Sequence, residues 1–123
     1  MTTRILIIED DTVSMELMMY LLRSFEFQPI LAFDGKSGIE IAKMTQPDLI
    51  LCDIELPDIS GVSVLKALRC VDRLRTTPII AVTSMTSAGD EDGLLAMGFD
   101  GYLPKPIEPE LLSGQLSEFL HER

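Results

Sequence analysis

The stretch Ile5-Leu6-Ile7-Ile8-Glu9-Asp10-Asp11 joins a short apolar run directly to three acidic residues. A continuous apolar run of this length is typical of a strand that is buried on both faces of a parallel sheet. A solvated charge run does not normally begin at the end of such a strand, so the acidic residues need another explanation. Because ligands of open parallel sheets bind at the carboxyl ends of the strands, the stretch predicts a binding site at this edge.

Further apolar runs predict more strands, and amphipathic helical patterns lie between them. Strand and helix alternate five times, which favours one α/β domain whose parallel sheet is covered by helices on both faces. The predicted strands cover residues 5–8, 29–33, 49–52, 79–82 and 101–103, the first four of them as buried strands. The predicted helices cover residues 12–24, 35–44, 61–73, 88–97 and 109–120.

Length and charge restrict what the chain can do. Its 123 residues match a single domain, 1–123, with no room for an output domain. A net charge of -10 repels nucleic acid and anionic lipid, so we expect no direct nucleic-acid binding and no membrane insertion. Without a signal peptide or an apolar stretch of ~20 residues, a cytoplasmic location is expected. Cys52 and Cys70 lack metal-ligand spacing, and Cys52 is predicted to be a buried apolar side chain.

Three more polar residues follow the ends of predicted strands. Asp53 ends the third strand, Thr83 ends the fourth, and Lys105 follows the fifth. The intervals of 30 and 22 residues between them each fit one βα unit, so the side chains can meet the acidic residues at one edge of the sheet. Taken singly these residues have ordinary structural explanations, but their joint placement is specific.

These residue types suit phosphoryl transfer to a carboxylate. Carboxylates about 4 Å apart repel by about 4 kcal/mol per pair at an effective dielectric of 20. Either a bound Mg2+ or protonation of one acid relieves this repulsion. With the cation bound, Asp53 can act as a nucleophile that forms an acyl phosphate. Lys105 would supply a second positive charge, and the Thr83 hydroxyl would donate to the arriving phosphoryl group.

Four motifs contain the polar residues at the strand ends: Ile5-Leu6-Ile7-Ile8-Glu9-Asp10-Asp11, Leu49-Ile50-Leu51-Cys52-Asp53-Ile54-Glu55-Leu56-Pro57, Ala81-Val82-Thr83-Ser84 and Tyr102-Leu103-Pro104-Lys105-Pro106. With these motifs, the chain resembles the receiver domains of response regulators over its whole length. The resemblance is to the stand-alone, single-domain type of two-component signalling, similar to chemotaxis regulators. It implies a flavodoxin-like (βα)5 fold with a doubly wound five-stranded parallel sheet in the order 2-1-3-4-5.

The resemblance implies a phosphorylation-dependent switch rather than an enzyme that turns over a separate substrate. Asp53 would accept the phosphoryl group from a histidine kinase or a phosphotransfer protein, with Mg2+ as cofactor, and would lose it slowly by autodephosphorylation. Glu9 and Asp10 would form the acidic pair of the metal site. Asp10, Asp53 and the backbone carbonyl of Glu55 would be the metal ligands, whereas Asp11 fits the pattern less well.

The resemblance also assigns the residues that sense and report the phosphoryl group. Thr83 and Lys105 would bind it, and Tyr102 would be the rotating aromatic of the switch, although packing in the core is an alternative role for this tyrosine. The Lys105-Pro106 peptide bond is expected to be cis. The surface of the fourth helix and fifth strand would then change and regulate a downstream protein. A phosphatase is a further expected partner, and the chain is expected to be a monomer or a weak dimer.

Two positions depart from the commonest receiver pattern. Ser84 follows the switch threonine where alanine or glycine is usual, and Glu55 adds a carboxylate beside the site. We expect both residues to alter the lifetime of the phosphoryl group. The hypothesis for Glu55 is that it perturbs access of the hydrolytic water.

The first helix carries more apolar surface than one core-facing stripe requires. Either the helix is broadly buried, or the surplus docks a helical kinase or phosphotransfer domain, for which adaptable methionines are suited. One apolar stripe consists of Val13, Leu17, Tyr20 and Leu21, and the other of Met15, Met18, Met19 and Leu22.

Three other readings of the sequence are weaker. A haloacid-dehalogenase phosphatase would need an Asp-x-Asp pair after the first strand, where this chain has Glu9-Asp10-Asp11. A flavodoxin-like cofactor binder would place a flavin phosphate next to the same acids, which would repel it. A scaffold that keeps only the fold stays open, although the complete set of Asp53, Thr83 and Lys105 argues against it.

Overall fold

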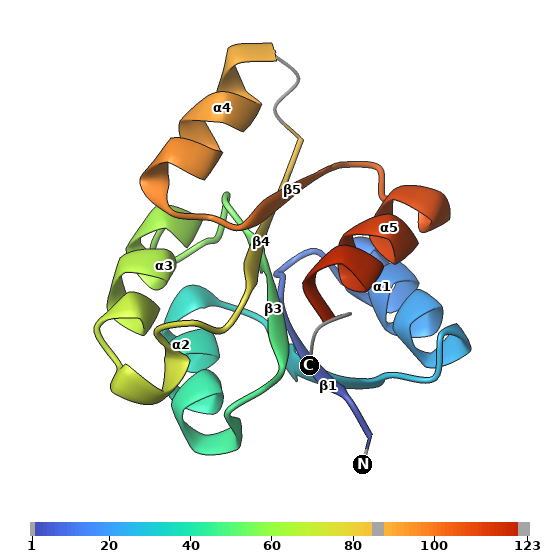
Figure 1. Cartoon of the computed structure of the whole chain (residues 1–123), viewed down its shortest axis with the longest axis horizontal. Helices are drawn as coiled ribbons and strands as arrows, with labels where there is room; N and C mark the ends of the chain where they lie inside the picture. Colours follow the sequence, from blue (N-terminus) through green and yellow to red (C-terminus); the bar gives the residue numbers. More distant parts are fainter. Residues whose placement is uncertain (1, 85–87, 121–123) are drawn as a thin grey trace.

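The computed structural model describes residues 2–84 and 88–120, which contain one parallel sheet of five strands. The order of the strands is β2-β1-β3-β4-β5, so the predicted doubly wound sheet is confirmed (Figure 1). The strands are β1 (Arg4–Ile8), β2 (Gln28–Ala32), β3 (Leu49–Asp53), β4 (Ile79–Thr83) and β5 (Gly101–Pro104).

Helices cover both faces of the sheet. In Figure 1, α1 and α5 lie on one side of the strands, and α2, α3 and α4 lie on the other. Successive side chains of a strand point to opposite faces, so Ile5 and Ile7 of β1 pack in the core under α1 and α5, and Leu6 and Ile8 pack in the other core. The helices are α1 (Thr12–Ser24), α2 (Gly35–Thr45), α3 (Gly61–Arg69), α4 (Ala88–Met97) and α5 (Pro109–Leu120).

Strand β2 is less buried than the sequence analysis predicted. The sheet order places it at an edge, and only Ala32 of its five residues is buried. Phe33, the last residue of the predicted strand, lies beyond the observed strand and is half-exposed. The apolar run predicted a buried strand, although the expected order 2-1-3-4-5 already placed it at an edge, where a strand leaves part of its side chains open to solvent.

Helix α3 is shorter than predicted, because it ends at Arg69 and not at residue 73. Val71 has an extended backbone, and a short 3-10 helix, η1 (Asp72–Leu74), follows it. The Arg69 guanidinium donates to the backbone carbonyls of Leu74, Arg75 and Thr77 and so holds this turn. The apolar pattern continued to residue 73, but the helix ends before the extended backbone of Val71.

The methionine stripe of α1 belongs to the core, which corrects the predicted docking role of these side chains. Met15 and Met18 are buried, at 2% and 1% exposure, and they pack with the residues of β1 and α5. Val13 and Tyr20, at 74% and 70%, are the strongly exposed apolar residues of this helix, and Leu17 between them is 37% exposed. The three residues recur at the spacing of one helix face, so the exposed stripe of α1 is Val13, Leu17 and Tyr20.

Most of the described apolar side chains of helix α4 are exposed to solvent. Among the described side chains of residues 91–97, only Leu94 is buried, whereas Leu95 and Met97 are exposed. Among the described residues, no helix combines the length and the apolar character needed to cross a membrane.

The start of α3 lies against the backbone of Asp53. The amide of Gly61 donates to the carbonyl of Ile54 at 2.9 Å, and the amide of Ile54 donates to Val82 in β4 at 3.0 Å. A Cβ atom at position 61 would lie 2.8 Å from the Ile54 Cα and would overlap the Asp53 carbonyl oxygen. Glycine at this position therefore allows α3 to support the end of β3.

We predict that Gly61→Ala destabilises the fold by about 1–3 kcal/mol, because the added methyl group must displace backbone at the end of β3. Gly114→Ala in α5 is the matched control, since a Cβ there meets no atom within 4 Å and alanine favours a helix by up to about 1 kcal/mol. Urea unfolding of both variants measures the two changes. A Gly61→Ala protein as stable as the native chain would contradict the close approach.

Candidate functional site

Four strands deliver polar side chains to the same edge of the sheet. Glu9 follows β1, Asp53 ends β3, Thr83 ends β4, and Lys105 follows β5. Glu9 and Thr83 have no exposed surface, and Asp53 is 3% exposed. The amide of Glu9 donates to Ala32 of β2 at 3.0 Å, and the amide of Lys105 donates to the carbonyl of Thr83 at 2.8 Å. Backbone hydrogen bonds thus hold the starting points of these side chains in place.

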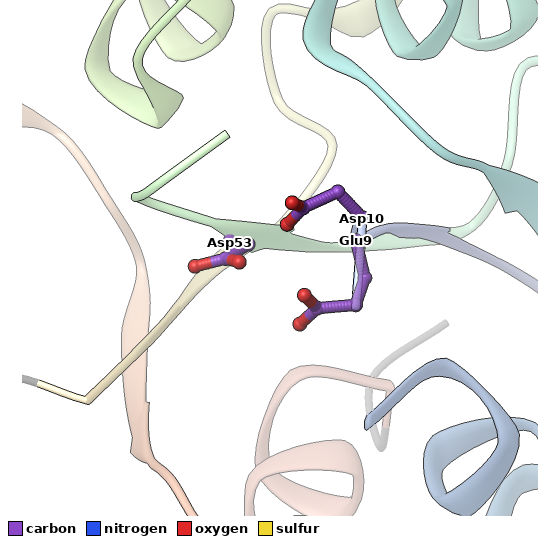
Figure 2. Close-up of side chains that lie close together, drawn as sticks. All are labelled: Glu9, Asp10 and Asp53. Atoms are coloured by element: carbon purple, nitrogen blue, oxygen red, sulfur yellow. The ribbon is translucent and has the colours of Figure 1, made fainter. Parts of the chain in front are cut away.

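Three carboxylates form a compact cluster at this edge. Glu9, Asp10 and Asp53 each offer an oxygen atom, and these atoms lie within 4.8 Å of one another (Figure 2). Glu9 and Asp53 are buried, and Asp10 is exposed. Oxygen donors of this kind, with one open side, match the preference of Mg2+, which keeps several of its waters. The donor set therefore fits the metal that the sequence analysis expected.

Asp11 has a different role from its two acidic neighbours. Its carboxylate accepts a hydrogen bond from the Ser14 amide at 2.9 Å and forms the N-cap of α1. This backbone hydrogen bond lowers the pKa of Asp11 below its ordinary value. The Asp11 amide donates to Glu9 at 3.1 Å. Asp11 thus begins the helix and orients Glu9 through its backbone.

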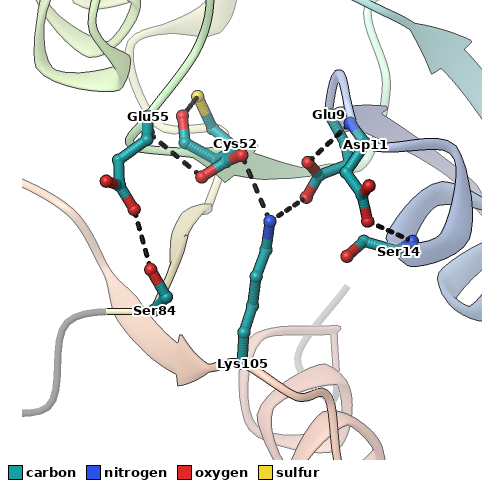
Figure 3. Close-up of polar contacts among 8 residues, drawn as sticks. Glu9, Asp11, Ser14, Cys52, Glu55, Ser84 and Lys105 are labelled. Carbon is teal, nitrogen blue, oxygen red and sulfur yellow. Dashed lines mark hydrogen bonds and ion pairs between the residues drawn. The ribbon is translucent and has the colours of Figure 1, made fainter.

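Lys105 joins two of the carboxylates. Its Nζ atom lies 2.8 Å from Glu9 Oε1 and 3.2 Å from Asp53 Oδ2 (Figure 3). Burial acts to lower the pKa of Lys105, but the hydrogen bond to Glu9 and the negative charges of Asp53 and Glu9 outweigh it and raise this pKa. The side chain therefore stays an ammonium group at neutral pH. The Lys105-Pro106 peptide bond is cis.

Glu9 titrates far from its ordinary range. Burial raises the pKa of Glu9 to about 7, and the neighbouring Asp53 adds to the increase, whereas Lys105 opposes it. At neutral pH and without a metal, the protonated and the ionised forms of Glu9 are therefore both populated. Protonation of Glu9 and binding of a cation are both consistent with this geometry as ways to reduce the repulsion among the carboxylates.

Thr83 and Tyr102 lie near each other in the register of β4 and β5. Tyr102 pairs with Ala81, and Thr83 pairs with Pro104 two positions further along. Tyr102 is half-buried and packs against the core under α2, α3 and α4. Their roles as switch residues stay predictions.

Glu55 makes two polar contacts that the sequence did not predict. Its amide donates to Asp53 Oδ1 at 3.1 Å, and its carboxylate accepts a hydrogen bond from the Ser84 hydroxyl at 2.9 Å (Figure 3). The sequence marked both residues as departures from a pattern, but no feature of it indicated that they meet. The Glu55 carbonyl as a metal ligand stays a prediction.

Asp58 anchors the loop that follows Asp53. Its carboxylate accepts hydrogen bonds from the amides of Gly35 and Lys36 at the start of α2, both at 2.8 Å. The sequence gives no signal for this contact, because Gly35 lies 23 residues away from Asp58 in the chain. The loop that carries Glu55 is therefore tied to the first turn of α2.

Comparison with known proteins identifies the family. The family model of the response regulator receiver domain matches residues 5–117, so the chain belongs to the response regulator receiver family. Among curated proteins, the chain is 37% identical over 107 residues to the polar-differentiation response regulator DivK of Brucella ovis, and the match covers 87% of each chain.

Solved structures of receiver domains have the same fold. One is the receiver domain of the sensor histidine kinase PA1611 of Pseudomonas aeruginosa PAO1, which has a magnesium ion coordinated in its active-site cleft. It is 30% identical, with a TM-score of 0.90, and the match covers 98% of this chain and 99% of that one. Another is the receiver domain of the Saccharomyces cerevisiae response regulator Ssk1 in a co-crystal with the histidine phosphotransfer protein Ypd1. This match has 26% identity and a TM-score of 0.87 and covers 96% of this chain and 88% of that one.

We predict that Asp10→Asn weakens Mg2+ binding by at least about tenfold, or about 1.4 kcal/mol, because it removes one charged ligand. Asp11→Asn is the matched control. It removes a neighbouring charge but keeps the helix cap, and at physiological ionic strength it should change the affinity less than about threefold. Isothermal titration calorimetry measures both affinities. Equal losses in the two variants would contradict the assignment of Asp10 to the cluster and of Asp11 to the helix cap.

Proposed function

We propose that the chain is a phosphorylation-dependent switch of a two-component phosphorelay and that Asp53 accepts the phosphoryl group. The observation that carries the proposal is the convergence of Asp53 with Glu9, Asp10 and Lys105 at one edge of the sheet. Membership of the receiver family and the similarity to DivK support it. The proposed compartment is the cytoplasm.

The chemical step is an in-line displacement at phosphorus. A carboxylate oxygen of Asp53 attacks the phosphorus of a phosphohistidine, a P–O bond forms as the P–N bond breaks, and the imidazole nitrogen keeps the electron pair. Asp10 and Asp53 would hold a Mg2+ ion, whose charge would offset that of the phosphoryl oxygens. Lys105 is already oriented toward Asp53 and provides an ammonium group to the same oxygens. No separate substrate is turned over, and slow hydrolysis of the acyl phosphate resets the switch.

The signal passes from the site to the surface of α4 and β5. Thr83 is the last residue of β4, and its hydroxyl would donate to the phosphoryl group and draw the strand end inward. Tyr102 would rotate into the space that Thr83 leaves. Few of the described α4 side chains are buried, so a shift of this helix would disrupt few packing contacts. A downstream protein would read this surface.

The exposed stripe of α1 is the proposed docking surface for the phosphodonor. Val13, Leu17 and Tyr20 lie on one helix face, and α1 begins directly after the acidic residues, so a partner on this face would reach Asp53. The complex of the Ssk1 receiver domain with the phosphotransfer protein Ypd1 supports a partner of that kind. The donor would therefore be a histidine kinase or a phosphotransfer protein with an apolar helical surface.

We predict that acetyl phosphate with Mg2+ adds one phosphoryl group to the native chain and none to Asp53→Asn, as intact mass measures. Omission of Mg2+ should abolish most of the reaction, because the charges on the phosphoryl oxygens then lack a cation. Asp11→Asn should still be phosphorylated, since Asp11 caps α1. A native chain that takes up no phosphoryl group under these conditions would favour a phosphorylation-independent scaffold.

We predict that Tyr20→Lys slows phosphoryl transfer from a phosphotransfer protein by at least about tenfold, because it places a charge in a desolvated apolar contact. The rate with acetyl phosphate should stay unchanged, since the small donor needs no docking surface. Leu111→Lys on α5 is the matched control at another exposed apolar position. Equal rates for both variants with the protein donor would refute docking at the exposed stripe of α1.

A further inference from the structure

A hydrogen bond joins the loops that follow β3 and β4 beside the site. The Ser84 hydroxyl donates to the Glu55 carboxylate at 2.9 Å (Figure 3). Glu55 belongs to the loop after β3, and Ser84 is the first residue after β4. Both residues are exposed to solvent. The Glu55 carboxylate lies outside the cluster of Glu9, Asp10 and Asp53, and the metal ligand predicted at this position is the backbone carbonyl of Glu55.

Both ends of this contact are connected to groups that change on phosphorylation. The amide of Glu55 donates to Asp53 Oδ1 at 3.1 Å, so Glu55 touches the phosphoacceptor through its backbone. Ser84 directly follows Thr83 in the chain, and Thr83 is the residue that would move toward the phosphoryl group. The Ser84–Glu55 hydrogen bond therefore restrains the end of β4 relative to the loop of β3.

The charge of the phosphoryl group acts on the same contact. A phosphoryl group on Asp53 would add almost two negative charges at a position two residues before Glu55 in the chain. Like charges repel, which favours positions of Glu55 farther from Asp53. Because Ser84 follows Thr83, it would move toward the phosphoryl group together with Thr83 while Glu55 is repelled from that group, and these opposite displacements would lengthen the contact. A hydrogen bond with a charged acceptor is stronger than one between neutral groups, but an exposed one changes an equilibrium by only a few fold.

We propose that the Ser84–Glu55 hydrogen bond is a latch that favours the unphosphorylated conformation and that phosphoryl charge on Asp53 opens it. The proposal rests on the proposed function and deepens it, because it names a positioning pair that determines how readily the chain switches. The latch acts in addition to Thr83, since it uses the repulsion of Glu55 rather than a new hydrogen bond to the phosphoryl group.

The test uses beryllofluoride with Mg2+ as a phosphoryl mimic, and NMR titration measures its apparent affinity for the full chain. Ser84→Ala should bind beryllofluoride about two- to fivefold more tightly than the native chain, because the latch no longer opposes switching. Ser84→Thr keeps the hydroxyl and should restore the native affinity. Ser113→Ala, at an exposed serine of α5, is the matched control and should leave the affinity unchanged.

A double-mutant cycle distinguishes the latch from other effects of Ser84. In a Glu55→Ala background the additional change Ser84→Ala should have no effect, because the hydrogen bond is already absent. An unchanged or weaker affinity of Ser84→Ala, or an equal gain in both backgrounds, would overturn the proposal. If instead the native chain binds no beryllofluoride, or Asp53→Asn binds it equally well, the proposed function fails and not only the latch.

Discussion

Repulsion among carboxylates at one sheet edge is the constraint on which the site depends. Glu9 and Asp53 are buried beside Asp10, and a pair of such charges about 4 Å apart costs about 4 kcal/mol at an effective dielectric of 20. Without a metal, Lys105 offsets part of this cost through its contacts at 2.8 and 3.2 Å, and the raised pKa of Glu9 offsets another part. The remaining repulsion lowers the stability of the fold and favours the binding of a cation at this edge.

The fold keeps this unfavourable cluster together by fixing its backbone. Parallel pairing of β1, β3, β4 and β5 brings the strand ends to one edge, and buried cores on both faces hold the sheet. Gly61 lets α3 begin directly against Asp53, and Asp58 ties the next loop to α2. Asp11 begins α1 and donates its amide to Glu9. The side chains around the site are therefore positioned by groups that do no chemistry themselves.

The alternation of strands and helices and the clustering of the polar residues followed from the sequence pattern, because apolar runs indicate buried strands and parallel strands share one carboxyl edge. The strand order 2-1-3-4-5 followed from the resemblance to receiver domains. The two stripes of α1 were harder, since periodicity shows that Met15 and Tyr20 differ in direction but not which one faces the sheet. Asp58 at α2 and Glu55 at Ser84 could not be predicted, because these contacts join distant loops whose conformations carry no periodic signal. Local sequence patterns thus predicted the helices, the strands and the strand ends. The tertiary contacts between loops became visible only in the three-dimensional structure.

NMR titration of the Glu9 carboxyl group, with and without Mg2+, measures the repulsion within the carboxylate cluster. We expect a midpoint near pH 7 without metal, because burial and Asp53 disfavour the charged form. Added Mg2+ should lower this midpoint, since a cation favours the carboxylate. A midpoint near the ordinary value of 4.5 that does not respond to Mg2+ would contradict this expectation.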